Sequence, residues 1–313
     1  MRFLDALSGR NQGRPPIWLM RQAGRYSPSY QAIRKNHPLR ELFFTPELIK
    51  TITLLPIQEL DVDAAILFSD ITVIVKALGL SLDFSEGPVI GSGPLSPKPV
   101  EKVLAPIADA IRMLRKEATV PLIGFCGGPY TVAYFMKQEI TPSLLQSLTE
   151  ATLDYIDLQI DAGVDAFQIF DSRSHQLNSL HPLCLPYHEQ LIRKVQSRGI
   201  PVISFFSSAS EHLEEIAAVK PTVISVDPLQ PLAEIRKKTN CVLQGNFDPD
   251  LLFAPLGTIE EKALCLLDSM NNDPGFIFNL GGGIKPKTSW EAVERLIRTV
   301  KEYDVDRILQ KNN

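Results

Sequence analysis

The sequence lacks most features that mark specialised classes of protein. It has a net charge of −4, with no basic stripe and no block of like charges, which argues against nucleic-acid binding. Its four cysteines form no Cys-x-x-Cys pair, which argues against a zinc or redox motif and favours buried, reduced thiols. No apolar stretch reaches the ~18 residues of a membrane helix, and MRFLDALSGRNQGR has no signal-peptide core. We therefore expect a cytoplasmic protein that binds neither nucleic acid nor membrane.

What the sequence does contain is enough apolar material for a sizeable core. Apolar residues make up 44% and charged residues 22% of the 313 positions, a globular composition. Eight short apolar runs recur, continuous rather than alternating, as expected for parallel strands covered on both faces. The runs are Ile17–Met20, Ala64–Phe68, Pro121–Phe125, Ala166–Phe170, Pro201–Phe206, Thr222–Val226, Cys241–Gln244 and Phe276–Leu280.

Helical patterns separate these runs. Between positions 145 and 160, apolar side chains recur on one helical face, and Gly163 supplies a stop. Thr288 and Glu291 predict a capping box ahead of the last apolar stripe. The segment 229–239 leaves room only for a short helix.

The alternation of strand and helix, repeated eight times, predicts the fold class. It indicates an α/β protein with a (β/α)₈ TIM barrel, formed as a single domain over residues 1–313. The widest gap between expected strands contains the Gly/Pro/Ser-rich piece 86–99, which we interpret as an excursion from the barrel.

In such barrels the chemistry collects where strands meet the loops that follow them. Polar residues and glycines fill all eight expected strand ends, where glycine lets backbone approach a ligand closely. The ends are Arg21–Tyr26, Ser69–Asp70, Cys126–Tyr130, Asp171–Arg173, Ser207–Ser208, Asp227–Pro228, Gln244–Asn246 and Gly281–Gly283.

The first of these ends, MRQAGRY, carries two arginines four positions apart around a glycine. Arginine offers a forked set of donors that matches carboxylate or phosphate. Asp70 fits either a helix N-cap or a carboxylate at the barrel mouth, and Asp171 has the same ambiguity. The run Gly281–Gly283 fits a phosphate cradle or a plain turn. No histidine shows metal-ligand spacing, so the residues themselves indicate a metal-free barrel enzyme with an anionic substrate.

The segment PPIWLMRQAGRY closely resembles the N-terminal signature of the uroporphyrinogen decarboxylase family. Five further blocks resemble family blocks in family order: AAILFSDI, PLIGFCGGPYT, QIFDS, LQGNFDP and FNLGGGI. The resemblance runs from about Pro16 to the final helix. It implies a cofactor-free barrel, commonly a homodimer, that removes carbon dioxide from the four acetate arms of uroporphyrinogen III and yields coproporphyrinogen III in haem biosynthesis.

The resemblance also implies roles for individual residues. Asp70 matches the carboxylate that accepts the pyrrole N–H groups and counters the cationic ring, and Arg21 matches a proposed acid. The substrate-binding residues implied by the match are Arg21, Gln22, Ala23, Gly24, Arg25, Asp70, Tyr134, Ser172 and Gly282.

Three positions depart from the family pattern. Gly282 stands where the family motif Asn-Leu-Gly-His-Gly has histidine, and the expected tyrosine aligns on Phe135, one position after Tyr134. The loop Lys137–Ser143 lacks a glycine-rich insertion. Two alternatives stay open: a cobalamin-linked methyltransferase relative with a zinc site, although no His-x-Cys occurs, and a barrel that binds porphyrinogens without turnover.

Overall fold

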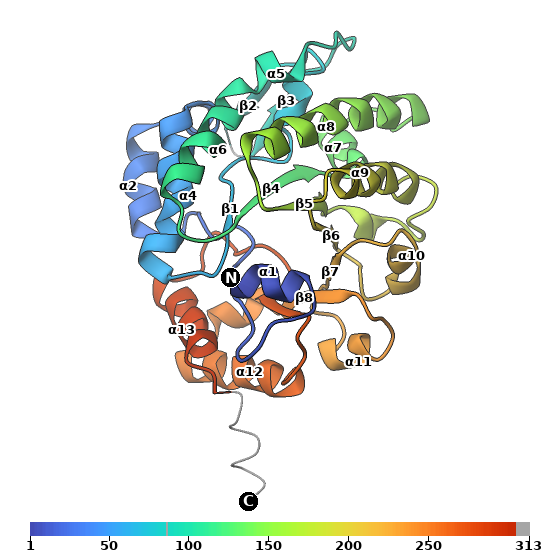
Figure 1. The fold of residues 1–313 in the computed structure, drawn as a ribbon. Helices are drawn as coiled ribbons and strands as arrows, with labels where there is room; N and C mark the ends of the chain where they lie inside the picture. The colour runs from blue at the N-terminus through green and yellow to red at the C-terminus, as the bar shows by residue number, and fades with distance from the viewer. Residues whose placement is uncertain (86, 305–313) are drawn as a thin grey trace, which may run out of the picture.

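The computed structural model describes residues 1–85 and 87–304. Figure 1 shows a central ring of strands surrounded by helices. Within the described residues, seven parallel strands pair in the order β1-β4-β5-β6-β7-β8-β9. Their bounds are β1 (Ala65–Ile66), β4 (Leu122–Gly127), β5 (Ala166–Asp171), β6 (Val202–Phe206), β7 (Val223–Ser225), β8 (Val242–Phe247) and β9 (Phe276–Leu280).

Helices follow the strands and cover the outside of the sheet (Figure 1). The α-helices are α1 (Arg2–Leu7), α2 (Pro28–Asn36), α3 (Leu39–Phe44), α4 (Pro46–Leu60), α5 (Val100–Val103), α6 (Ala105–Glu117), α7 (Pro129–Met136), α8 (Pro142–Ala162), α9 (Leu185–Ser197), α10 (Leu213–Ala218), α11 (Leu232–Arg236), α12 (Leu256–Ser269) and α13 (Trp290–Lys301). The short 3₁₀ helices in the described residues are η1 (Val73–Lys76), η2 (Ser174–Gln176) and η3 (Pro249–Phe253).

The first expected strand, Ile17–Met20, is not a strand, so this prediction was wrong. Only one residue of it, Ile17, forms a parallel bridge, with Phe278 of β9. The preceding prolines have no N–H to donate to a ladder, and the backbone N–H of Met20 donates to the side chain of Asn279 at 3.0 Å. The segment still lies between β1 and β9, because Asp63 N donates to Ile17 O at 2.8 Å. It therefore occupies the first strand position and completes the (β/α)₈ barrel.

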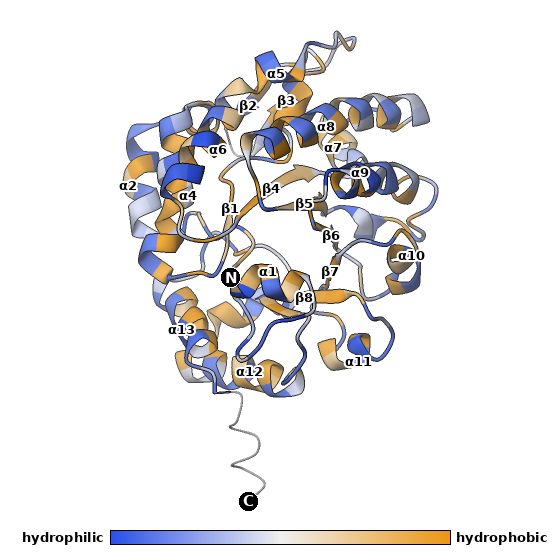
Figure 2. Ribbon diagram, in the orientation of Figure 1, coloured by the Kyte–Doolittle hydropathy of each residue, from blue (hydrophilic) through white to orange (hydrophobic). Residues whose placement is uncertain are grey.

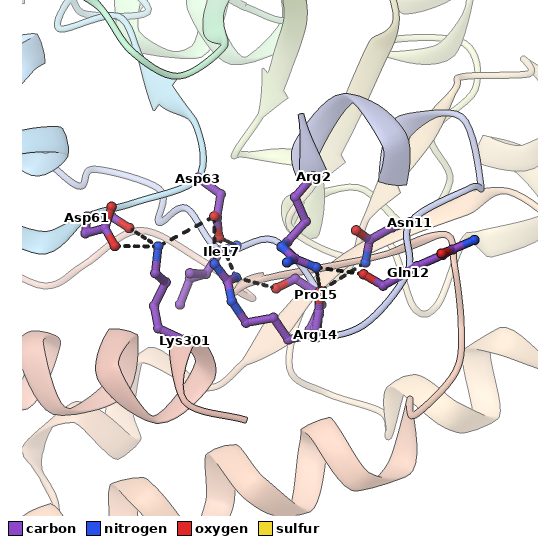
Figure 3. Close-up of polar contacts among 9 residues, drawn as sticks. All are labelled: Arg2, Asn11, Gln12, Arg14, Pro15, Ile17, Asp61, Asp63 and Lys301. Atoms are coloured by element: carbon purple, nitrogen blue, oxygen red, sulfur yellow. Dashed lines mark hydrogen bonds and ion pairs between the residues drawn. The ribbon is translucent and has the colours of Figure 1, made fainter. Parts of the chain in front are cut away.

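The segment enters this position through a polar network at the amino end of the strands (Figure 3). Two nitrogens of Arg14 donate to the two oxygens of Asp63 at 2.7 and 2.9 Å, and Ile17 N donates to Asp63 Oδ2 at 2.8 Å. Lys301, at the end of α13, forms ion pairs with Asp61 at 2.6 Å and with Asp63 at 3.7 Å. The network fixes the chain just before it crosses the barrel towards the MRQAGRY loop.

The core lies between the strands and the inner faces of the helices. Figure 2 shows apolar colour along β4 and β8, while the surrounding helices carry both colours. Gly163 ends α8 with a positive φ of 112°, as expected. The cap of α13 is Ser289, whose hydroxyl accepts from Ala292 N at 3.1 Å, so the predicted capping box at Thr288 was one position early. Among the cysteines, Cys126 and Cys184 are buried as expected, but Cys265 is exposed.

The expected excursion from the barrel is partly a hairpin. The strands β2 (Leu82–Phe84) and β3 (Pro88–Ile90) pair antiparallel outside the main sheet, and residue 86 lies outside the described residues. The helix between the sixth and seventh strand positions is α11, which has five residues, as predicted. In the described part of the chain, no helix has the length and apolar character needed to cross a bilayer.

Candidate active site

The MRQAGRY loop is held in place by its own polar groups. Gln22 is 1% exposed, and its side chain accepts from Leu19 N at 3.2 Å and donates to Ala64 O at 3.3 Å. The hydroxyl of Tyr26 donates to Gln22 O, and its ring stacks on Trp290 at 5.9 Å. These contacts give the Gln22 side chain a positioning role, because its oxygen binds Leu19 N and its nitrogen ties the loop to Ala64, next to β1.

The same loop presents its two arginines to solvent. Arg21 has a left-handed φ of 61°, and both Arg21 and Arg25 are exposed. Neither forms a salt bridge with any residue in the described ranges 1–85 and 87–304. Ala23 and Gly24 between them are half-buried. A short, fixed loop therefore carries two arginines whose side-chain donors bind no described residue and can bind an external anion.

Gly283 explains where the Arg21 side chain lies. A Cβ at Gly283 would stand 2.8 Å from Cδ and 3.2 Å from Nε of Arg21, so the guanidinium stem runs against glycine backbone. A Cβ at Gly282, by contrast, would meet only Pro249 Cγ, at 3.7 Å. The glycine run thus seats an arginine, and it leaves space for a side chain at its middle position.

Asp70 follows β1 and is not the N-cap of the next helix, because the N-cap of η1 is Thr72. Its Oδ1 accepts from Thr72 N at 2.9 Å and from Thr72 Oγ1 at 2.5 Å, which fixes the turn into η1. Its Oδ2 accepts no hydrogen bond from the described residues. Asp70 therefore caps a turn with one oxygen and keeps the other available at the barrel mouth.

The electrostatics of Asp70 link it to the first loop. Burial raises the pKa of Asp70, while the Thr72 hydrogen bonds and the charge of Arg21 oppose that rise. A carboxylate in poor contact with water interacts strongly with a positive charge placed beside its free oxygen. Thr72 was missed in the sequence, although the Asp-x-Thr spacing is typical of such a turn.

The second acid at a strand end, Asp171, is structural. It is fully buried, and Oδ1 accepts from Thr131 N at 3.2 Å and Thr131 Oγ1 at 2.8 Å. Its Oδ2 lies 3.2 Å from His188 Nδ1, and His188 Nε2 lies 3.0 Å from Ser204 Oγ. Asp171, His188 and Ser204 have the composition of a hydrolytic triad, but no substrate reaches a serine with zero exposure. His188 is thus a core residue on the buried face of α9.

Beside this buried group, Ser172 and Tyr134 lie at the rim. Ser172 is half-buried directly after β5. Tyr134 is 37% exposed, and its hydroxyl accepts from Gln176 Nε2 at 3.3 Å. The structure therefore brings Tyr134 to the loop after β5 and places no contact between it and Asp70. No group of three or more His, Cys, Asp or Glu side chains in the described ranges is arranged to hold a metal ion.

Comparisons with known proteins agree with this architecture. A family model described as uroporphyrinogen decarboxylase matches residues 1–303. A protein of that name from Protochlamydia amoebophila is 40% identical over 333 residues, covering 96% of this chain and 91% of the relative. Another from Anaeromyxobacter sp. is 38% identical over 341 residues, covering 96% and 98%.

Solved structures add a likeness of fold alone. A methyltransferase from Methanosarcina mazei superposes with a TM-score of 0.77 at 21% identity, covering 96% of this chain and 97% of the other. A B12-independent methionine synthase from Shewanella sp. superposes with a TM-score of 0.61 at 13% identity, covering 96% of each chain. Because the family model spans residues 1–303 and the sequence relatives match 96% of the chain, the chain belongs to the uroporphyrinogen decarboxylase family.

Proposed function

We propose that this protein removes carbon dioxide from the four acetate side chains of uroporphyrinogen III and yields coproporphyrinogen III in haem biosynthesis. Family membership supports this reaction. The observation that carries the assignment of the site is Oδ2 of Asp70, which has no partner in the described part of the chain, near a loop whose two arginines also pair with no described residue. A substrate with eight carboxylates and four pyrrole N–H groups needs both kinds of contact.

The reaction requires an electron sink. When an acetate loses carbon dioxide, the electron pair of the broken C–C bond stays on the methylene carbon. Protonation of the adjacent ring carbon makes the pyrrole cationic, and that ring accepts the pair. A proton is then added to the methylene carbon, and the proton that was added to the ring carbon leaves, which gives the methyl group and restores the neutral pyrrole. Because the sink is the substrate's own ring, this route needs no metal and no cofactor.

Asp70 is the catalytic residue in this scheme. Its free oxygen accepts pyrrole N–H bonds, and its charge stabilises the ring cation as it forms. Preorganised charge in a site that excludes water stabilises a transition state far better than water does. The same burial that raises the pKa of Asp70 strengthens its attraction for the cation.

Arg21 and Arg25 bind acetate and propionate carboxylates at the mouth. The proton that starts each cycle comes from Arg21 or from a water that Arg21 holds, since a guanidinium gives up its own proton reluctantly. Ser172 donates its hydroxyl to a substrate carboxylate. Gln22 acts through the loop backbone, and Ala23 and Gly24 allow that backbone to approach the substrate.

The test is a turnover assay on the purified protein. Uroporphyrinogen III is incubated without oxygen, with a chelator and no added cofactor, and the products are oxidised and separated by number of carboxylates. We expect the tetracarboxylate product to accumulate. Binding without loss of carboxylates would overturn the proposed function, and a strict requirement for bound zinc would favour the methyltransferase alternative. We further propose that the protein is cytoplasmic and forms a homodimer of single-domain subunits. Sedimentation of the pure protein tests whether it is a dimer.

A further inference from the structure

Arg173 has an arrangement that the proposed mechanism does not use. Its guanidinium carbon lies 5.0 Å from the ring centre of Tyr134 and 5.0 Å from that of Phe135. The two rings stand nearly perpendicular to each other, at 87°. Both rings make cation–π contacts with the guanidinium, and these contacts do not use its N–H groups as hydrogen-bond donors.

The donors of the Arg173 side chain have no partner among the residues that the structure describes. No salt bridge or side-chain hydrogen bond joins Arg173 to another residue in the ranges 1–85 and 87–304. Its backbone is nevertheless fixed, because Arg173 N donates to Thr131 Oγ1 at 3.1 Å and Thr131 binds Asp171. A half-buried arginine with a fixed backbone, two aromatic contacts and N–H groups that no described residue accepts can bind an external anion.

Arg173 lies at the end of the barrel where we propose that the porphyrinogen binds. It follows Ser172 at the carboxyl end of β5, the end of the barrel that carries Asp70 and Arg21. In barrel order β5 lies opposite β9, after which the Arg21 side chain is seated against Gly283. The connection from α7 to α8 spans only residues 137–141 beside this rim. A macrocycle with carboxylates on all four rings presents carboxylates to both sides of the mouth.

We propose that Arg173 binds a carboxylate of the porphyrinogen on the side of the mouth opposite Arg21, with Tyr134 and Phe135 as its cradle. The inference rests on the proposed function, because it uses the same ligand. It gives a physical role to Phe135, which stands where the family has tyrosine, because its ring contacts the guanidinium of Arg173. It also supplies a carboxylate contact to a chain that has glycine at position 282.

The test compares Arg173→Met and Arg173→Lys with the wild type. We expect KM for uroporphyrinogen III to rise about tenfold or more in Arg173→Met, the loss typical of a charge-assisted hydrogen bond, with a smaller change in kcat. Arg173→Lys keeps the charge without the fork, so its KM should fall between the two. Arg193→Met is the matched control, because Arg193 is exposed on α9 and pairs with Glu189. Its KM should equal that of the wild type.

Two further measurements distinguish a role of Arg173 in substrate binding from a purely structural role. Phe135→Leu loosens the cradle and should raise KM in the same direction by less. Thermal unfolding is followed for every variant. A lower melting temperature in Arg173→Met with unchanged KM would show that the arginine only braces α7 against β5, and would overturn the inference.

A binding assay keeps the inference separate from the proposed function. The oxidised octacarboxylate porphyrin is titrated into wild type and Arg173→Met by calorimetry. Weaker binding by the variant supports the role of Arg173 even if the wild type shows no turnover, a result that would sink only the decarboxylase assignment. Equal affinities would overturn the role of Arg173 whatever the turnover assay shows.

Discussion

Asp63 and Asp70 flank the same two-residue strand, β1, and their environments are opposite. Asp63, at the amino end, receives two hydrogen bonds from Arg14 and one from Ile17 N. Although burial alone would raise the pKa of Asp63, these bonds and the charges of Arg14 and Lys301 lower it overall. Asp70, at the carboxyl end, has one oxygen without a partner among the described residues, and burial raises its pKa.

The difference shows that the two ends of one strand have different roles, one in stability and one in ligand binding. An acid whose hydrogen-bonding capacity is filled by the protein stabilises the fold. An acid left partly unsatisfied in a poorly hydrated site destabilises the fold when charged, and its free oxygen is available to a ligand. In barrels of this kind the amino end of the strands serves stability and the carboxyl end serves chemistry. The two aspartates show that division within eight positions of one another.

The largest effect is expected at Asp70. Asp70→Asn keeps an oxygen that accepts from Thr72 and removes the charge that faces the substrate ring. Turnover should fall by about 100- to 1,000-fold, the loss typical of removing one preorganised transition-state contact. Asp70→Gly, which removes the side chain, should abolish turnover. Rates are compared at saturating substrate by chromatography of the oxidised products.

Thermal unfolding provides the control for this variant. Because burial disfavours the charged form of Asp70, the neutral asparagine should raise the melting temperature at neutral pH. A folded, more stable and inactive Asp70→Asn would establish a functional acid. Undiminished turnover would remove Asp70 from the mechanism.

The second largest effect is expected at Asp63, where stability should change and turnover should not. Asp63→Asn leaves Arg14 without its anionic partner, where each side chain is only 13% exposed. The free energy of unfolding should fall by about 2–3 kcal/mol, measured by denaturant titration. The folded fraction should keep its kcat, because Asp63 lies at the opposite end of the strand from the mouth. A large loss of kcat with unchanged stability would break the division between the two ends.

Smaller effects are expected from substitutions in the glycine run at the barrel mouth. Gly283→Ala places a Cβ 2.8 Å from Arg21 Cδ and should displace that arginine, raising KM by about fivefold for a weakened hydrogen bond. Gly282→His has room, because the nearest atom to its Cβ is Pro249 Cγ at 3.7 Å. Its turnover should equal or exceed that of the wild type. Steady-state kinetics on both variants test the pair.

Gly281→Ala is the steric contrast. A Cβ there would lie 2.7 Å from backbone N and from Cδ of Pro228, so the variant should unfold more readily than the other two. A large loss of turnover in Gly282→His would show that the loop is built around a different contact.

Much of the fold was predictable, since it depends on periodicity. The strands β4 to β9 lie on the expected runs, because continuous apolar segments have few ways to be buried other than as covered parallel strands. The run at Ile17 failed because Asp63 and Asn279, distant in sequence, take backbone hydrogen bonds that a neighbouring strand would otherwise make. Local pattern does not reveal such partners.

The site was predictable in its residue types and less so in their roles. Asp70 and Asp171 both follow an apolar run, and nothing local distinguishes them. Only the fold shows that Thr131 and His188 fill the capacity of Asp171, whereas Thr72 fills half of that of Asp70. Arg173 lay among the expected strand ends, but its contacts with Tyr134 and Phe135 depend on how α7 lies against the residues that follow β5.

The smallest effect is the dependence of stability on pH, and its sign separates the two aspartates. The folded-state pKa of Asp63 is lowered from 3.8, so its stabilisation is present above that value and is lost as pH falls through the folded pKa. The folded-state pKa of Asp70 is raised from 3.8, so its relative stabilisation is present at low pH and is lost as pH rises through the folded pKa.

The measurement is the free energy of unfolding of wild type, Asp63→Asn and Asp70→Asn from neutral pH downward. At neutral pH the wild type should be more stable than Asp63→Asn and less stable than Asp70→Asn, and both differences should shrink on acidification. Two differences of the same sign at neutral pH would mean that Asp70 is satisfied like Asp63. Asp70 would then have no carboxylate oxygen available to a ligand, and the contrast between the two ends of β1 would have no functional meaning.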